Sequence, residues 1–167
     1  SENLLILTEI LTRQGYLTRQ AINGQAALNS IRKDPPALIL LDIMMPGLDG
    51  YEVCRQLKRA EPSRDIPVIF ISALADALDK VRAFQAGGVD YVTKPFQVEE
   101  VVSRVQTHLN LRNLQKHLQL QNLQLQQEII ERKQAEETLQ HRNRELSLLN
   151  RLSHRFSSSL ELDDVFT

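Results

Sequence analysis

The sequence predicts an α/β fold with a doubly wound parallel sheet, followed by one long C-terminal helix. Helix-like and strand-like patterns alternate through residues 1–108, which indicates parallel strands with helices on both faces of the sheet. Two of the strand-like segments, Ala37–Leu41 and Ile66–Ala73, are short and largely apolar, the pattern of strands buried on both faces. All 6 glycines and all 6 prolines lie at or before Pro95, so nothing in the later sequence stops a helix.

The amino-terminal residues predict a helix, a strand and a second helix. Ser1 and Gly15 are the expected caps of the first helix, whose apolar face consists of Leu4, Leu7, Ile10 and Leu11. A loose alternation from Tyr16 to Ile22 predicts the strand. The second helix follows Gly24, ends at Asp34-Pro35-Pro36, and has Ala27, Leu28 and Ile31 on its apolar face.

A central strand is predicted over Ala37–Asp42, where five apolar residues precede a carboxylate. In open α/β sheets ligands bind beyond the carboxyl ends of the strands, so the position of Asp42 favours chemistry. The alternative is that Asp42 only caps the strand before a turn. The later elements are predicted as a helix over Tyr51–Lys58, a strand over Ile66–Ala73, a helix over Asp79–Ala86, a strand over Val89–Phe96 and a helix from Val98.

Polar residues end three of the predicted strands, namely Asp42, Ser72 and Lys94. Because the ends of parallel strands lie at one edge of a sheet, these side chains can converge. A carboxylate can act as a nucleophile toward an activated phosphoryl group, while a hydroxyl and an ammonium group hold its oxygens. The added negative charge needs a divalent cation, and for oxygen ligands and phosphate this is Mg²⁺.

Four segments match one known family: Leu40–Gly50 (LLDIMMPGLDG), Ile71–Ala73, Ala86–Tyr91 and Lys94–Phe96. With them, residues 1–108 resemble the receiver domain of two-component response regulators, the CheY-like or flavodoxin-like fold. The resemblance implies that Asp42 is the phosphoacceptor, Ser72 the switch hydroxyl, Tyr91 an aromatic side chain that changes rotamer, and Lys94 the phosphate-sensing lysine. Taken singly, each of these has an ordinary structural alternative, such as a surface lysine or a half-buried tyrosine.

The same resemblance implies a magnesium site and a protein that donates the phosphoryl group. Asp42 and the backbone carbonyl of Met44 would be ligands of Mg²⁺, and the bond before Pro95 would be cis. A histidine kinase or a phosphotransfer protein would donate the phosphoryl group.

The sequence departs from the family at its amino end. Family members begin with an apolar strand that ends in an acidic pair, and this chain has neither before Asn3. In the family that strand lies between the segments that here are Gln20–Ile22 and Ala37–Asp42. We therefore expect a receiver trimmed at its amino end, with a gap in the sheet, unpaired strand edges and weak or absent Mg²⁺ binding.

The later half of the chain predicts a coiled-coil helix running from about Val98 to about Phe156. One position of a seven-residue repeat holds Leu111, Leu118, Leu125, Leu139, Leu146 and Leu160, and its companion holds Leu114, Ala135, Leu149 and Phe156. Gln121, Glu128, Arg132 and Arg142 interrupt this seam, and Ile129 suggests a four-residue shift. We expect a parallel homodimer. The alternative is a helical hairpin folded back on the receiver.

Residues 109–152 are thus interpreted as a coiled-coil linker. Residues 153–167 resemble the start of a GAF sensory domain, which predicts that an output domain follows. His154 lacks the sequence context of a phosphorylated kinase histidine, so His154 and the other histidines are interpreted as solvated helix residues: His108, His117 and His141.

Composition excludes several other classes of function. A net charge of -1 gives no reason to expect nucleic acid or an anionic membrane as a partner, and no apolar run is long enough to span a membrane. A single cysteine, Cys54, excludes an internal disulfide framework and favours the cytoplasm. The prediction is a non-enzymatic phosphorelay receiver. Its alternatives are a non-phosphorylated dimerisation module and a regulatory fragment of a larger hybrid histidine kinase or cyclic-dinucleotide enzyme.

Overall fold

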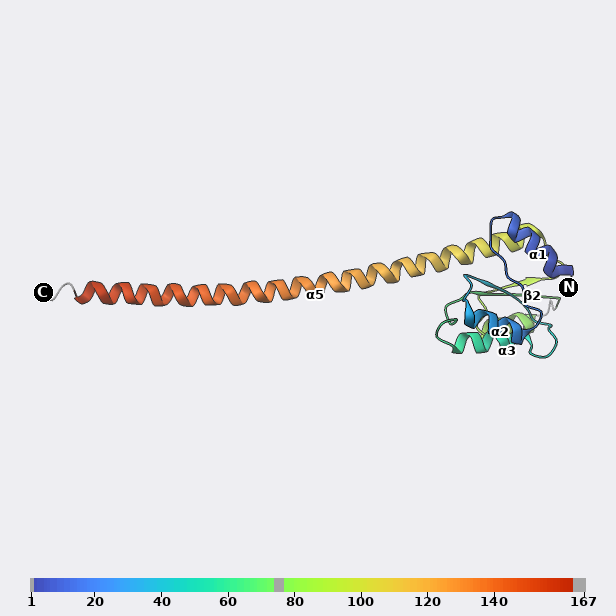
Figure 1. Ribbon diagram of the computed structural model, residues 1–167, viewed down its shortest axis with the longest axis horizontal. Helices are drawn as coiled ribbons and strands as arrows, with labels where there is room; N and C mark the ends of the chain where they lie inside the picture. Colours follow the sequence, from blue (N-terminus) through green and yellow to red (C-terminus); the bar gives the residue numbers. More distant parts are fainter. Residues whose placement is uncertain (1, 74–76, 164–167) are drawn as a thin grey trace. The chain divides into compact units, whose positions relative to one another are not determined.

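The computed structural model describes the backbone of residues 2–73 and 77–163, and the side chains of residues 5–73 and 77–153 (Figure 1). The expected cap Ser1 and the side chains of Leu4, Phe156 and Leu160 lie outside these described parts. The chain divides into two compact units, residues 1–116 and residues 117–167. The first unit contains the whole sheet.

The sheet has three parallel strands in the order β1-β2-β3, among the described residues. They are β1 (Ile39–Asp42), β2 (Val68–Ser72) and β3 (Asp90–Thr93). The middle strand, β2, is buried along its whole length. The predicted parallel sheet is therefore confirmed for these three strands, each within the bounds of the predicted strand.

Helices cover both faces of the sheet, as the sequence predicts. They are α1 (Glu2–Arg13), α2 (Gly24–Lys33), α3 (Gly50–Arg59), α4 (Ala77–Gln85) and α5 (Val98–Asp163). Successive β2 side chains point to opposite faces. Phe70 packs with the apolar side chains of α2 and α3, whereas Ile69 and Ile71 pack with those of α1 and the start of α5.

Side chains and a glycine set the ends of the helices. Asn23 and Asp49 cap α2 and α3 by accepting hydrogen bonds from backbone N–H groups in the first turn. Beyond α1, Gly15 adopts a positive φ of 86°, and the N–H of Tyr16 donates to the carbonyl of Leu11. This is the Schellman arrangement that the position of Gly15 predicts.

The predicted strand over Tyr16–Ile22 is wrong, because this segment forms no strand. A strand needs a backbone ladder with a neighbour, and the strand neighbour of β1 in the described sheet is β2. The segment is instead attached through side chains. Gln20 donates to the hydroxyl of Thr8, and Arg19 forms an ion pair with Asp34. Its apolar side chains Leu17 and Ile22 remain exposed.

Helix α5 is continuous from Val98 to Asp163, which confirms the predicted unbroken helix and extends it beyond Phe156. Its 66 residues contain no turn at which a hairpin could form. The first turns pack on the receiver unit through Val101, Val105 and Leu109, whereas side chains 117–153 are exposed. Within the described residues, no helix is both long and apolar enough to span a membrane.

One prediction about the histidines is also wrong. The side chain of His108 is only 15% exposed, because it packs against Asp90 at the start of β3. His117 and His141 are exposed, as predicted. The helical pattern alone did not reveal that α5 places His108 over the receiver.

Candidate functional site

The carboxyl ends of the three strands place Asp42, Ser72 and Lys94 at one edge of the sheet. Asp42 and Ser72 are the last residues of β1 and β2, and Lys94 directly follows β3. The backbone N–H of Lys94 donates to the carbonyl oxygen of Ser72 over 2.8 Å. The convergence expected from a parallel sheet is therefore present in the structure.

Asp42 and Lys94 form an ion pair across β2. Lys94 Nζ lies 2.5 Å from Asp42 Oδ2, and the other carboxylate oxygen accepts the N–H of Met44 over 3.1 Å. The Asp42 side chain is 35% exposed, and that of Lys94 is 21% exposed. An anionic oxygen beside an ammonium group, both reachable from solvent, can accept an electrophile whose product is negatively charged.

The loop after β1 folds back against Asp42 because glycine occupies one tight position. A Cβ on Gly50 would lie 2.3 Å from the carbonyl oxygen of Asp42. The N–H of Gly50 donates to the carbonyl of Ile43 over 3.0 Å, and Asp49 then starts α3 as its cap. The LDG part of the motif thus fixes the backbone beside the carboxylate.

The remaining expected site residues differ in exposure. Ser72 is fully buried and Tyr91 is 6% exposed, whereas Met44 is an exposed loop residue. The ammonium group of Lys80, on α4, lies 5.9 Å from the centre of the Tyr91 ring. The Lys94–Pro95 peptide bond is cis, as the resemblance implies. Ser72 and Tyr91 are therefore buried, in contrast to the partly exposed ion pair.

Sequence reasoning missed a contact between α3 and α4 near this edge. The hydroxyl of Tyr51 donates to the backbone carbonyl of Asp79 over 3.2 Å, and its ring packs on Phe70 with 5.6 Å between ring centres. Burial raises the pKa of the Tyr51 hydroxyl. The position of Tyr51 directly after the LDG segment was the available signal, but the residue was interpreted only as part of a helix.

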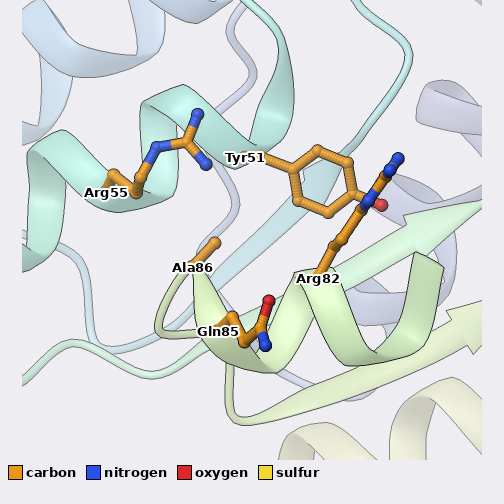
Figure 2. Close-up of a pocket in the computed structure, with 5 residues that line it drawn as sticks. All are labelled: Tyr51, Arg55, Arg82, Gln85 and Ala86. Atoms are coloured by element: carbon orange, nitrogen blue, oxygen red, sulfur yellow. The ribbon is translucent and has the colours of Figure 1, made fainter. Parts of the chain in front are cut away.

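A hollow of about 250 Å³ lies beside this contact, lined by Tyr51, Arg55, Arg82, Gln85 and Ala86 (Figure 2). Arg55 forms an ion pair with Glu52 on its own helix, and the carboxylate of Asp79 lies 3.9 Å from Arg82. None of the strand-end residues lines the hollow. It is therefore separate from the candidate site.

The residues at the strand ends do not form a complete magnesium site. Among the described residues, no group of three or more His, Cys, Asp or Glu side chains lies close enough to hold a metal ion. Mg²⁺ requires an octahedral set of oxygen ligands and is normally bound through one or two carboxylates plus phosphate and water. Asp42 provides one carboxylate, and Lys94 already pairs with it. Asp42 is thus the carboxylate that the described strand ends offer to the ion.

Comparisons with known proteins agree with the fold. The family model of the response regulator receiver domain matches residues 1–106. The DNA-binding dual master transcriptional regulator RpaA of Synechocystis is 42% identical over 99 residues, which is 59% of this chain and 41% of RpaA. This chain thus covers less than half the length of that relative. Within the family, receiver domains are signalling domains rather than catalysts.

Two solved receiver structures are similar over the same region. The signal receiver domain of a signal transduction histidine kinase from Syntrophus aciditrophicus has a TM-score of 0.61 and 37% identity, covering 65% of this chain and 83% of that one. The receiver domain of sensor histidine kinase PA1611 from Pseudomonas aeruginosa, with magnesium coordinated in its active site cleft, has a TM-score of 0.61 and 30% identity, covering 65% and 88%. The chain belongs to the response regulator receiver domain family.

Proposed function

We propose that this chain is a phosphoryl-accepting receiver of a two-component phosphorelay and that Asp42 is its phosphoacceptor. The observation that supports this best is the 2.5 Å ion pair between Asp42 and Lys94 at the exposed strand ends. A phosphoryl group on Asp42 would place its negative oxygens next to this ammonium group. The donor would be a histidine kinase or a phosphotransfer protein.

In the proposed step, a carboxylate oxygen of Asp42 attacks the phosphorus of a phosphohistidine. The bond between phosphorus and nitrogen breaks, and its electron pair stays on the donor imidazole, which is neutral because its other nitrogen holds a proton. The product is an acyl phosphate. Lys94 then pairs with the phosphoryl oxygens, the hydroxyl of Ser72 donates a hydrogen bond to them, and Tyr91 changes rotamer.

The change at Asp42 would reach other domains through α5, with residues 1–108 as the receiver. We propose that residues 109–152 form a parallel homodimeric coiled coil and that residues 153–167 begin a GAF-like domain. Leu118 and Leu125, in the predicted seam, are 50% and 56% exposed on the isolated helix, which supports the need for a second copy. Phosphorylation would then act as a local charge change that biases a two-state element.

The test is intact-mass spectrometry of the chain after incubation with acetyl phosphate, with and without Mg²⁺. We expect a gain of one phosphoryl group that is lost in Asp42→Asn. Asp49→Asn is the matched control, because asparagine caps a helix about as well as aspartate and the substitution removes a nearby carboxylate. An extended version, with a strand that carries an acidic pair added at the amino end, is tested in parallel.

Each outcome has a distinct meaning. If both versions are labelled, Asp42, Ser72 and Lys94 are sufficient for phosphorylation by acetyl phosphate. If only the extended version is labelled, Asp42 is supported as the acceptor and the acidic pair is necessary for phosphorylation. Labelling of neither contradicts the proposal.

The last outcome would favour the second candidate function, a dimerisation module that is not phosphorylated. The observation in its favour is the incomplete ligand set for Mg²⁺ around Asp42.

A further inference from the structure

The start of α5 presents two neighbouring rows of side chains to the receiver. An apolar row of Val101, Val105 and Leu109 packs into the cluster that includes α1 and β3. A polar row of Glu100, Arg104 and His108 lies beside it, because residues four apart share one side of a helix. The apolar row stabilises the contact by burying apolar surface, whereas the polar row forms hydrogen bonds and ion pairs, which have defined geometry.

Two members of the polar row, Arg104 and His108, contact one carboxylate, that of Asp90, the first residue of β3. Asp90 Oδ1 accepts hydrogen bonds from Arg104 Nη1 at 2.6 Å and from the N–H of Tyr91 at 2.8 Å, while Asp90 Oδ2 lies 3.0 Å from His108 Nε2. The Asp90 and His108 side chains are 19% and 15% exposed. Arg104 also pairs with Glu100. This partly buried cluster attaches α5 to β3.

A second contact attaches α5 to the segment before β1. Arg112 Nη1 donates to the carbonyl oxygens of both Pro36 and Ala37. Arg112 Nε is buried and has no hydrogen-bond partner among the described residues. Burial also lowers the pKa of this guanidinium. Since an unsatisfied buried N–H is unfavourable, the two carbonyl contacts have to compensate for it.

The two contacts lie at the opposite ends of the strands that form the candidate site. β1 has Arg112 near its amino end and Asp42 at its carboxyl end. β3 has Asp90 at its amino end and is followed by Lys94. Each strand is short, about 13 Å for four residues, and stiff because of its ladder to β2. A shift of β1 relative to β3 therefore changes the ion pair at one end and the α5 contacts at the other.

We propose that Asp90 and Arg112 are positioning residues that together set the direction of the first part of α5, residues 98–116, on the receiver sheet. Arg104 and Arg112 are eight residues apart, about 12 Å along the helix. A helix attached at two such points has a defined direction, whereas one attached at a single point can pivot. The link from this direction to Asp42 rests on the proposed function; the positioning role itself does not.

Electron-electron distance measurement between two spin labels tests the proposal on the full chain. One label is placed at Lys33→Cys, at the end of α2, and the other at Lys116→Cys, an exposed residue of α5 within the receiver unit. The native Cys54 is fully buried and its pKa is raised to about 11 by burial, so it does not compete for the label. Labelled chains are diluted with unlabelled chains so that distances between copies do not contribute.

We expect a single narrow distance distribution in the parent protein. Arg112→Met and Asp90→Ala should each broaden or shift the distance distribution. Arg112→Lys should give a distribution closer to that of the parent protein, since an ammonium group can donate to the same carbonyls. Asn110→Ala, an exposed residue of the same helix, is the control. A distribution unchanged in both Arg112→Met and Asp90→Ala, in chains with an intact receiver by tyrosine fluorescence, overturns the proposal.

The link to the site has its own readout. Asp42→Asn weakens the ion pair without any phosphoryl group, and it should shift the same distribution in the unphosphorylated protein. If Arg112→Met and Asp90→Ala shift the distribution but acetyl phosphate labels neither the chain nor its extended version, the positioning role stands and Asp42 is not the phosphoacceptor. If acetyl phosphate labels the chain but the distances are unchanged in Arg112→Met and Asp90→Ala, the phosphoacceptor stands and the positioning role is rejected.

Discussion

Leucine has opposite surroundings in the two units of the chain. In the receiver unit, Leu28 and Leu57 are each 2% exposed, whereas Leu118 and Leu125 of α5 are 50% and 56% exposed. The receiver folds helices onto both faces of its own sheet, so its apolar side chains find partners within the chain. In residues 117–153, the described chain provides no such partner. A leucine side chain is buried only where the protein provides a complementary apolar surface. For residues 117–153 of α5, we infer that a second copy of the chain provides this surface.

The largest expected effect is on the receiver core. Phe70 is fully buried, packs on Tyr51 and leaves no room for a Cβ at Gly88. Phe70→Ala should lower the free energy of unfolding by about 3–5 kcal/mol, the range for removing a buried aromatic side chain. Urea unfolding followed by tyrosine fluorescence measures this, because all 3 tyrosines lie in the receiver unit.

Leu123→Ala is the control for that comparison. Leu123 is 63% exposed and lies outside the predicted seam, so its truncation should change receiver stability by less than about 0.5 kcal/mol. Equal effects of the two substitutions would contradict the contrast between the units.

The second prediction concerns the proposed dimer. Leu118→Arg and Leu125→Arg place charges in the predicted seam and should convert a dimer to a monomer. Leu120→Arg and Leu123→Arg place the same charge outside the seam and should leave the dimer intact. Light scattering after size-exclusion chromatography gives the mass of each variant.

Two results would count against this account. Equal masses for all four variants would contradict the seam. If Leu118→Cys fails to form a disulfide between the two copies while the parent protein is dimeric, the parallel orientation is wrong.

The smallest expected effect is a pH dependence at the first α5 contact. Burial raises the pKa of Asp90, but hydrogen bonds from Arg104, His108 and the Tyr91 N–H outweigh this effect and lower the pKa overall. The pKa of an aspartate in the unfolded chain is about 3.9, and that of Asp90 in the folded protein is lower. The Asp90 carboxylate therefore stabilises the folded protein fully at a pH above about 3.9, and this stabilisation is lost as the pH falls through the pKa of the folded state.

The measurement compares the parent protein with Asp90→Asn by urea unfolding at pH 6 and pH 3. The stability difference should be larger at pH 6 than at pH 3. A difference that does not change with pH would mean that the Asp90 charge contributes nothing.

Much of the receiver could be predicted from the sequence because its signals are local. Apolar runs identified β1 and β2, and the alternation of helix and strand patterns identified β3. Polar residues at the predicted strand ends then pointed to Asp42, Ser72 and Lys94. The parallel sheet then brought Asp42 and Lys94 together, a consequence of topology that needs no knowledge of individual contacts.

The failures depend on partners that the local pattern does not specify. The alternation in Tyr16–Ile22 suggested a strand, but a strand exists only where a neighbour offers a ladder. His108 looked like a solvated helix residue because its partner, Asp90, is 18 positions away in sequence. Arg112 was missed for the same reason, since the carbonyls that it binds belong to the loop before β1.

The most direct test of the central claim is to locate the phosphoryl group after labelling with acetyl phosphate. Borohydride reduces an acyl phosphate of aspartate to homoserine, which marks the modified position permanently, and peptide mass spectrometry then identifies it. We predict homoserine at position 42 in the parent protein and in Asp49→Asn. Homoserine at another aspartate, with position 42 unchanged, would contradict the assignment of Asp42 as the phosphoacceptor.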